Sequence, residues 1–282
     1  MTIQSHRHLL LALSLTGLVG CTSPAPAPAA SAAREAAPAP SAATKVTPAP
    51  PMRAPRSVRA AAPTDKLHLT RTTGSVEGPI PYTIVAPSDE RADLPIVIAL
   101  HGRGDRAEGF CRLVERLRLP YRFIVAEAPM RWGLGGGKQW FEMKASDRAD
   151  QLRRRVAELG GLAAKVAKRW PRAPAPSLLG FSQGAMLALQ AVAQTPQRFA
   201  GVIALSGALI ETEGLAAASI GRRVWLSAGT SDRIVKPETT QRAADALKAL
   251  GHDAEVFRFK GGHAIPADVV SRVRETLTLW HA

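Results

Sequence analysis

A serine held between two glycines offers the clearest chemistry in the sequence. The stretch Gly180-Phe181-Ser182-Gln183-Gly184 follows a short apolar run and precedes an amphipathic run over residues 185–193. A strand, a sharp turn and a helix in this order expose a serine hydroxyl as a nucleophile, and glycines leave room where a side chain would collide with neighbouring elements. The backbone N–H of Gln183 would lie at the positive end of a helix, where it can stabilise an oxyanion. The alternative is an ordinary Gly-Ser turn between two core elements.

Two later loops supply an acid and a base. Asp232 follows the apolar run 223–228, and a loop carboxylate is suited to hold an imidazole in one tautomer. His263 follows two glycines after the run 254–259, and these flexible flanks fit a general base that reaches Ser182. A turn-forming or helix-capping role is the alternative for Asp232. The other candidate bases fit worse, since they lie in an early strand, a polar turn and the terminus: His68, His252 and His281.

A fourth loop, His101-Gly102-Arg103-Gly104-Asp105, follows the continuous apolar run 95–100. Its glycines let the backbone approach a substrate closely, so the backbone N–H of Arg103 is the candidate for a second oxyanion donor. His101 could serve as the base, but its place directly at the strand end favours an orienting role within the loop. Asp105 is expected to cap the following helix.

Strand and helix patterns alternate along the chain and position these loops. The runs 67–73 and 81–86 alternate apolar and polar residues, which predicts two antiparallel strands. Continuous apolar runs alternating with amphipathic ones then predict an α/β fold with a mostly parallel sheet covered on both faces. Ligands bind such sheets beyond the carboxyl ends of the strands, and all four loops lie there. Strands are expected over 95–100, 121–126, 178–181, 201–205, 223–228 and 254–259, and helices over 106–117, 147–170, 185–193, 238–250 and 266–280.

Residues 67–280 resemble the phospholipase/carboxylesterase family of α/β-hydrolases, which includes the acyl-protein thioesterases. The similar segments are the His101 loop, the Gly-Phe-Ser-Gln-Gly stretch, the Asp232 loop and Gly262-His263. Gln139-Trp140-Phe141-Glu142 is similar to the family's Trp-Phe-Asp segment in the lid near the acyl pocket, with glutamate where aspartate is usual. The family usually has a hydrophobic residue where Arg103 stands, which alters the edge of the cleft but not the backbone donor.

The resemblance implies a serine hydrolase with the α/β-hydrolase fold, a carboxylic ester or thioester substrate and no cofactor. Ser182, Asp232 and His263 become the catalytic triad, in the α/β-hydrolase chain order. The backbone amides of Arg103 and Gln183 become the oxyanion hole. For the acyl side the candidates are Trp132, Trp140 and Phe141, although core packing explains each equally well. The glycine-rich segment 131–137 is expected to form a loop beside this pocket.

Other functions remain open at this point. A peptidase or polyester depolymerase would use the same triad, and a non-catalytic surface lipoprotein would reuse the fold for binding. An intact triad argues against the binder, because binding has no physical need of all three groups. The natural substrate and the oligomeric state do not follow from the sequence.

The first 20 residues have the pattern of an export signal. A basic start is followed by about a dozen apolar residues, too few to span a bilayer. Leu18-Val19-Gly20-Cys21 resembles the lipobox of bacterial lipoproteins, which implies lipidation of Cys21 and anchoring in the cell envelope, with the outer membrane favoured. An ordinary cleaved signal or a cytosolic apolar leader is the alternative. Residues 21–65, rich in Ala and Pro, are expected to form a disordered tether, and residues 66–282 the catalytic domain.

Charge and cysteine content exclude other classes. Six of the 37 basic and two of the 23 acidic residues precede Lys66, so the domain has 31 basic and 21 acidic residues and a formal charge of +10. Its arginines are scattered, with Arg153-Arg154-Arg155 the one tight cluster, so a solvated face is favoured over nucleic-acid binding. The sequence has no His and Cys cluster that would bind a metal, and Cys111 lies in an apolar helical pattern, which predicts a buried thiol.

Overall fold

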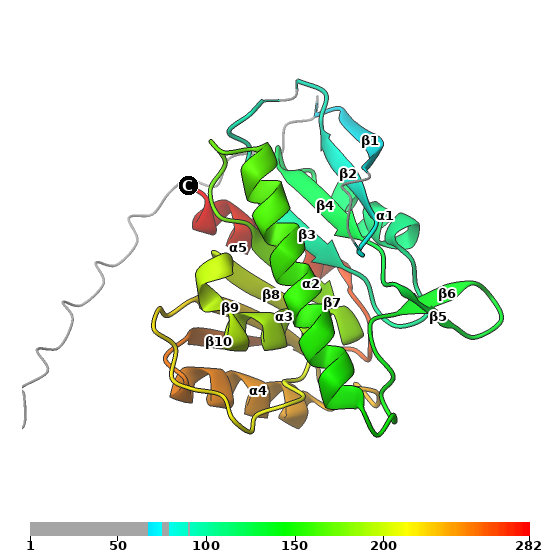
Figure 1. Ribbon diagram of the computed structural model, residues 1–282, viewed down its shortest axis with the longest axis vertical. Coiled ribbons are helices and arrows are strands. Elements are labelled where there is room, and N and C mark those ends of the chain that lie inside the picture. The colour runs from blue at the N-terminus through cyan, green and yellow to red at the C-terminus, as the bar shows by residue number, and fades with distance from the viewer. Residues whose placement is uncertain (1–66, 75–78, 90) are drawn as a thin grey trace, which may run out of the picture. The chain divides into compact units, whose positions relative to one another are not determined.

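The computed structural model describes residues 67–74, 79–89 and 91–282 (Figure 1). The expected signal and tether, residues 1–20 and 21–65, lie outside the described residues. Eight strands form one sheet in the order β1-β2-β4-β3-β7-β8-β9-β10. These strands are β1 (Leu69–Gly74), β2 (Tyr82–Pro87), β3 (Ile96–Leu100), β4 (Arg122–Ala126), β7 (Ser177–Phe181), β8 (Gly201–Leu205), β9 (Arg223–Gly229) and β10 (Asp253–Phe259).

The sheet is antiparallel at one edge and parallel elsewhere. β2 pairs antiparallel with both β1 and β4, and every pairing from β4 across to β10 is parallel. The central strands β3, β4 and β8 are buried at every residue. This burial explains why their sequences are continuous apolar runs, since both faces of a parallel sheet are covered.

Helices cover the two faces of the sheet (Figure 1). α2 (Arg148–Arg169), α3 (Gln183–Gln194) and α4 (Pro237–Ala249) bury their apolar residues in one cluster, which includes Ile98 and Leu178. α1 (Ala107–Leu117) and α5 (Ala267–Trp280) pack on the opposite face in a second cluster, which includes Val97 and Leu179. Adjacent strand residues thus point to opposite cores. The expected α/β architecture is confirmed.

Two local features differ from the expectations. The glycine-rich segment forms a two-stranded hairpin, β5 (Met130–Trp132) and β6 (Gly137–Gln139), which projects from the sheet (Figure 1). At the start of α1, Asp105 makes no capping hydrogen bond. The carboxylate of Glu127 accepts the backbone N–H of Ala107 at 2.5 Å instead. Glu127 follows β4, so only the pairing of β3 with β4 brings it to this helix.

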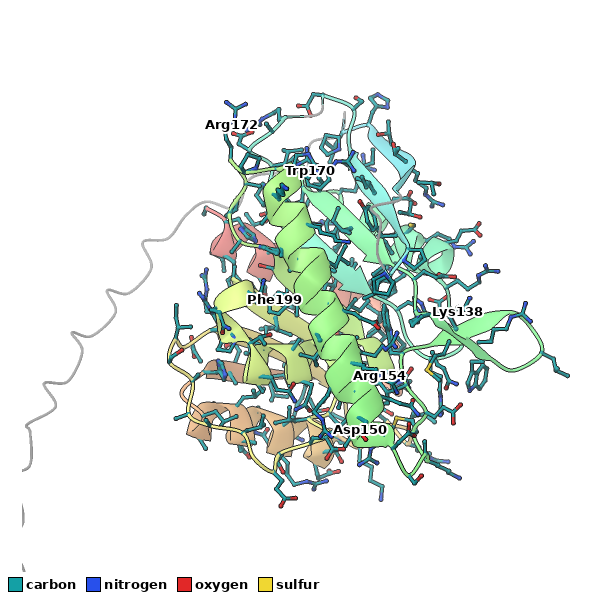
Figure 2. All side chains as sticks on the ribbon, viewed as in Figure 1. Lys138, Asp150, Arg154, Trp170, Arg172 and Phe199 are labelled. Atoms are coloured by element: carbon teal, nitrogen blue, oxygen red, sulfur yellow. The ribbon has the colours of Figure 1, made fainter. Side chains whose placement is uncertain are left out.

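The arginine cluster on α2 lies among acidic neighbours. Arg153 pairs with Asp150, Arg154 with Asp147 and Arg155 with Glu158. Figure 2 labels Asp150 and Arg154 on this helix, and both residues are exposed. Arg153 and Arg154 therefore form a solvated face with their own counter-charges, whereas the side chain of Arg155 is only 13% exposed. A short η1 helix (Pro196–Arg198) completes the described elements. In the part of the chain that the structure describes, no helix combines the length and apolar character needed to cross a bilayer.

Candidate active site

The turn between β7 and α3 places Ser182 at the carboxyl edge of the sheet, near its middle. Ser182 has φ 52° and ψ −116°, a conformation that a non-glycine residue rarely adopts. A Cβ on Gly180 would lie 2.5 Å from the carbonyl oxygen of Gly184, and one on Gly184 would overlap the carbonyl oxygen of Leu100. Both glycines are therefore required by close approach of the backbone, as the sequence predicted.

Three side chains from separate loops form a hydrogen-bonded chain. Nδ1 of His263 lies 2.8 Å from Oδ2 of Asp232, and Nε2 of His263 lies 2.9 Å from Oγ of Ser182. The Asp232 side chain is fully buried, whereas the His263 side chain is 18% exposed. His263 is 31 positions from Asp232 and 81 from Ser182 in the sequence, and the fold brings all three within hydrogen-bonding distance, in the order acid, base and hydroxyl.

Main-chain contacts hold the acid and base loops together. Because β9 and β10 are parallel neighbours, their loops leave the sheet side by side. The backbone N–H of Thr230 donates to Phe259 O at 2.9 Å, and that of Ser231 donates to Gly261 O at 2.8 Å. The second carboxylate oxygen of Asp232 accepts two backbone N–H groups, from Ile234 and Val235, at 2.8 and 2.9 Å. The carboxylate is therefore held with one oxygen toward His263.

The loop after β3 lies against Ser182, because β3 pairs directly with β7. A Cβ built on Gly102 would lie 3.5 Å from the Cβ of Ser182. In the described part of the chain, the backbone N–H groups of Arg103 and Gln183 donate to no protein acceptor. The N–H of Gln183 belongs to the first residue of α3, so it has no partner within the helix. Two free backbone donors thus flank the serine on adjacent loops.

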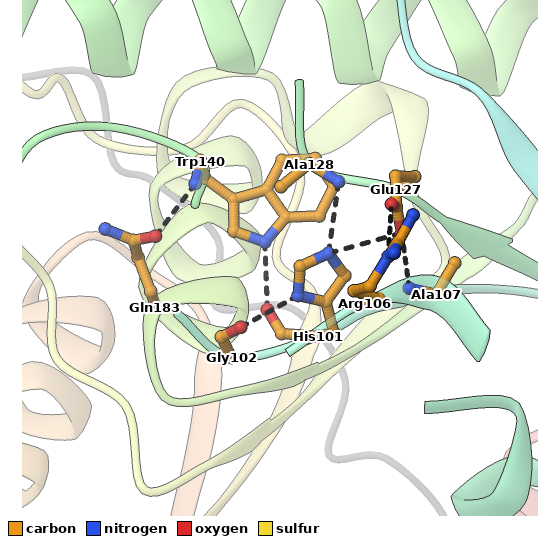
Figure 3. A network of polar contacts seen from close by, with 8 residues as sticks. All are labelled: His101, Gly102, Arg106, Ala107, Glu127, Ala128, Trp140 and Gln183. Atoms are coloured by element: carbon orange, nitrogen blue, oxygen red, sulfur yellow. Dashed lines mark hydrogen bonds and ion pairs between the residues drawn. The ribbon is translucent and has the colours of Figure 1, made fainter. Parts of the chain in front are cut away.

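His101 is fully buried and bound to the main chain (Figure 3). Its Nδ1 lies 2.8 Å from Gly102 O, and its Nε2 lies 3.1 Å from the backbone nitrogen of Ala128. A carbonyl only accepts and an amide N–H only donates, so the ring is neutral with its proton on Nδ1. Burial lowers the pKa of His101 below its ordinary value of 6.5. The ring does not reach Ser182, in line with the orienting role expected for it.

The three aromatic candidates for the acyl side have different surroundings. Trp140 and Phe141 are both fully buried within the core under α2 and α3, so core packing, the alternative left open, describes them in this structure. Trp132, on the hairpin, is 44% exposed and lies under the Arg103 guanidinium at 5.8 Å. The hairpin is joined to the loop after β3 by hydrogen bonds from Gly104 N to Lys138 O and from Lys138 N to Asp105 O.

The hairpin contact was missed at the sequence level. Its tip is exposed at Leu134, and its strands are only three residues long, so no apolar alternation marks them.

Among the described residues no cluster of three His, Cys, Asp or Glu side chains could hold a metal ion. Cys111 is buried on α1, as predicted. Burial raises the pKa of its thiol to about 11, so at neutral pH the side chain stays in the protonated, unreactive form.

Comparisons with known proteins identify the family of the chain. A model of the phospholipase/carboxylesterase family matches residues 81–281. Acyl-protein thioesterase 1 of Neurospora crassa is 27% identical over 209 residues, which cover 64% of this chain and 85% of that protein. Acyl-protein thioesterase 1 of Yarrowia lipolytica is 31% identical over 142 residues, which cover 45% of this chain and 63% of that protein.

Solved structures are similar over most of the described chain. Esterase PE8 has a TM-score of 0.61 and 28% identity, with 71% of this chain and 96% of that chain covered. A carboxylesterase from Mesorhizobium loti has a TM-score of 0.64 over 73% of this chain and 98% of that chain; at 19% identity it supports the fold alone. The chain belongs to the phospholipase/carboxylesterase family and is an esterase-type hydrolase with the α/β-hydrolase fold.

Proposed function

We propose that this hydrolase cleaves carboxylic ester or thioester bonds through an acyl-enzyme on Ser182. The observation that carries the proposal is the hydrogen-bonded chain from Asp232 Oδ2 through His263 to Ser182 Oγ, with distances of 2.8 and 2.9 Å. A serine hydroxyl is a weak nucleophile at neutral pH and needs an adjacent base. His263 is in reach of its proton, and Asp232 stabilises the imidazolium that results.

The reaction has two steps. Ser182 Oγ attacks the carbonyl carbon as His263 Nε2 takes its proton, and the negative charge develops on the carbonyl oxygen. The backbone N–H groups of Arg103 and Gln183 receive this charge; loss of one such donor typically raises the barrier by about 3 kcal/mol. His263 then passes the proton to the leaving alcohol or thiol. Water, deprotonated by His263, hydrolyses the acyl-enzyme and restores the serine.

The test compares Ser182→Ala with Ser231→Ala, which removes an exposed hydroxyl one residue from Asp232. We expect Ser182→Ala to lose measurable turnover of p-nitrophenyl esters and of a matched thioester, and to lose labelling by a fluorophosphonate probe. Ser231→Ala should keep both. Retained turnover in Ser182→Ala would reject the assignment, and an unlabelled wild type with no ester turnover would favour a non-catalytic binding protein. Turnover across a series of acyl lengths, beside a peptide and a polyester, defines the substrate class.

We also propose that the chain is exported as a lipoprotein. The support is the apolar run that ends in Leu18-Val19-Gly20-Cys21, followed by the Ala- and Pro-rich segment 21–65. Three acyl chains on Cys21 would anchor the domain stably, whereas one chain binds a membrane only marginally. Cys21→Ala should move the protein from the membrane to the aqueous fraction of expressing cells and abolish incorporation of labelled palmitate. Unchanged fractionation and labelling in this variant would exclude lipidation at Cys21.

A further inference from the structure

One buried tryptophan connects the two segments that flank Ser182, through its indole to one and through its backbone to the other. Trp140 is fully buried, and its indole N–H donates to the carbonyl oxygen of His101 at 2.9 Å. Its backbone N–H donates to the side-chain oxygen of Gln183 at 2.8 Å. Figure 3 shows Trp140 between the two loops, with one dashed contact to each. The loop after β3 and the start of α3 are thus bonded to a single residue that belongs to neither.

The side chain of Gln183 strengthens this connection. It is buried, with 2% of its surface exposed, and its Nε2 donates to Phe141 O at 2.6 Å while its oxygen accepts from Trp140. The side-chain amide of Gln183 therefore bonds to the backbone of two consecutive residues, Trp140 and Phe141, through its oxygen and its nitrogen. The backbone N–H of Gln183 takes no part in these bonds, so it remains available as the oxyanion donor. One residue acts through two separate groups.

His101 sets the direction of the other donor. Its ring donates to the carbonyl oxygen of Gly102, and Ala128 holds the ring from the opposite nitrogen. The Gly102 carbonyl and the Arg103 N–H belong to one peptide plane, and in a trans peptide they point in opposite directions. Fixing the Gly102 oxygen therefore fixes where the Arg103 N–H points. The carbonyl of His101 itself is held by Trp140, which completes the connection to Gln183.

We infer that Trp140, together with the side chains of Gln183 and His101, is a positioning unit that holds the two oxyanion donors in register. The inference rests on the proposed function, since it assigns a purpose to the same oxyanion hole. Backbone donors that already point at the developing charge need no reorganisation during the reaction. Even a small displacement of these donors would lower the rate. None of the three side chains touches the reacting atoms; each acts through the backbone of Arg103 or Gln183.

The test uses two variants that remove hydrogen bonds; the first replaces the indole by a smaller ring, and the second keeps a side chain of similar size. Trp140→Phe deletes the indole N–H, and Gln183→Met deletes both side-chain bonds and keeps the backbone N–H. We expect kcat on a p-nitrophenyl ester to fall by about ten- to a hundredfold with KM little changed, below the full effect of losing a donor. Affinity for a trifluoromethyl ketone, which binds the serine as a tetrahedral oxyanion, should weaken by the same factor as kcat/KM.

Trp225→Phe is the matched control, because Trp225 is buried within β9 and packs against Phe257. It should leave kcat and ketone affinity unchanged even where it lowers the thermal midpoint. The inference is overturned if Trp140→Phe and Gln183→Met keep wild-type kcat and ketone affinity while Ser182→Ala is inactive. If the core does not tolerate Trp140→Phe, Gln183→Met decides alone, and wild-type kcat and ketone affinity in that folded variant overturn the inference. Turnover by Ser182→Ala would instead reject the proposed function.

Discussion

Two histidines at the same edge of the sheet show how partners decide the chemistry of a side chain. His101 follows β3 and His263 follows β10, and each is next to glycine. His101 is fully buried and hydrogen-bonded between a backbone carbonyl and a backbone amide, and the Glu127 carboxylate lies 4.0 Å from its Nε2. His263 is 18% exposed at its side chain and lies between a carboxylate and a hydroxyl.

The two histidines differ in whether their hydrogen-bond partners can exchange a proton with the ring. A backbone carbonyl can only accept a hydrogen bond, and a backbone N–H does not lose its proton at any accessible pH. The His101 ring between them is therefore fixed in one tautomer. Around His263 one partner can give a proton and the other can stabilise the resulting positive charge. The same residue type therefore orients a loop in one place and serves as the proposed base in the other. The following changes test this contrast.

The largest effect is expected from His263→Ala, which removes the proposed base. By comparison with triad deletions in serine hydrolases, kcat should fall by about a million-fold. His101→Asn retains an N–H that can reach Gly102 O, so its kcat should fall far less. Steady-state kinetics on one p-nitrophenyl ester, with circular dichroism as the check on folding, measure both. Equal losses of kcat in two folded variants would break the contrast.

Asp232→Asn should lower kcat by about ten-thousandfold with little change in thermal stability. One oxygen of Asp232 is committed to the backbone N–H groups of Ile234 and Val235, so the new amide nitrogen would face His263. The ring would then have to accept at Nδ1 and carry its proton on Nε2, toward Ser182, which is the wrong tautomer. Kinetics beside thermal unfolding separate the two effects; a kcat within about tenfold of wild type would contradict this tautomer argument.

The smallest effect concerns acid stability. Burial lowers the pKa of His101, while the Gly102 carbonyl, Glu127 and Asp105 raise it and Lys138 lowers it. The folded protein therefore holds the ring neutral, and the unfolded chain takes up the proton as the pH falls below 6.5. The free energy of unfolding is greatest above this pH and decreases as the pH falls toward the lower, folded pKa.

His101→Asn should reduce the loss of stability between about pH 8 and about pH 5, because asparagine does not titrate in that range. A residual dependence should remain, since burial also lowers the pKa values of His252 and His281. Urea unfolding at the two pH values measures the difference in free energy. An unchanged pH dependence in His101→Asn would show that the buried ring contributes nothing to acid sensitivity.

Local sequence was sufficient to predict most elements and the loops of the site. Strands such as β3 and β8 are short apolar runs, and most helices are amphipathic, although α3 is buried at residues 183–193; the bounds agree to within a few residues. The pattern around Ser182 is partly local too: a Cβ at Gly180 would clash within the turn, with Gly184 and Ala185, whereas one at Gly184 would clash with the end of β3. The local features among these depend on neighbours in the chain, so a sequence pattern can reveal them.

Contacts between distant segments could not be read in this way. Glu127 rather than Asp105 meets the start of α1, and the glycine-rich segment pairs as a hairpin on the loop after β3. Trp140 and Phe141 were candidates for the acyl side, yet both lie in the core. Each outcome depends on which strands are neighbours and on how side chains fill the space between layers.

The chain's own pattern thus established an α/β sheet and named a serine, an acid, a base and two backbone donors. Only the packed structure gives the contacts that separate the two imidazoles: His263 lies against the serine, and His101 is bonded to the main chain. It also decided that one residue, Trp140, joins the two donor segments through its indole and its backbone N–H. The reason is that these roles depend on directions of bonds between segments 27 to 81 residues apart, from His101 and Ala128 to Ser182 and His263. Directions of that kind exist only once the sheet order has brought the loops together.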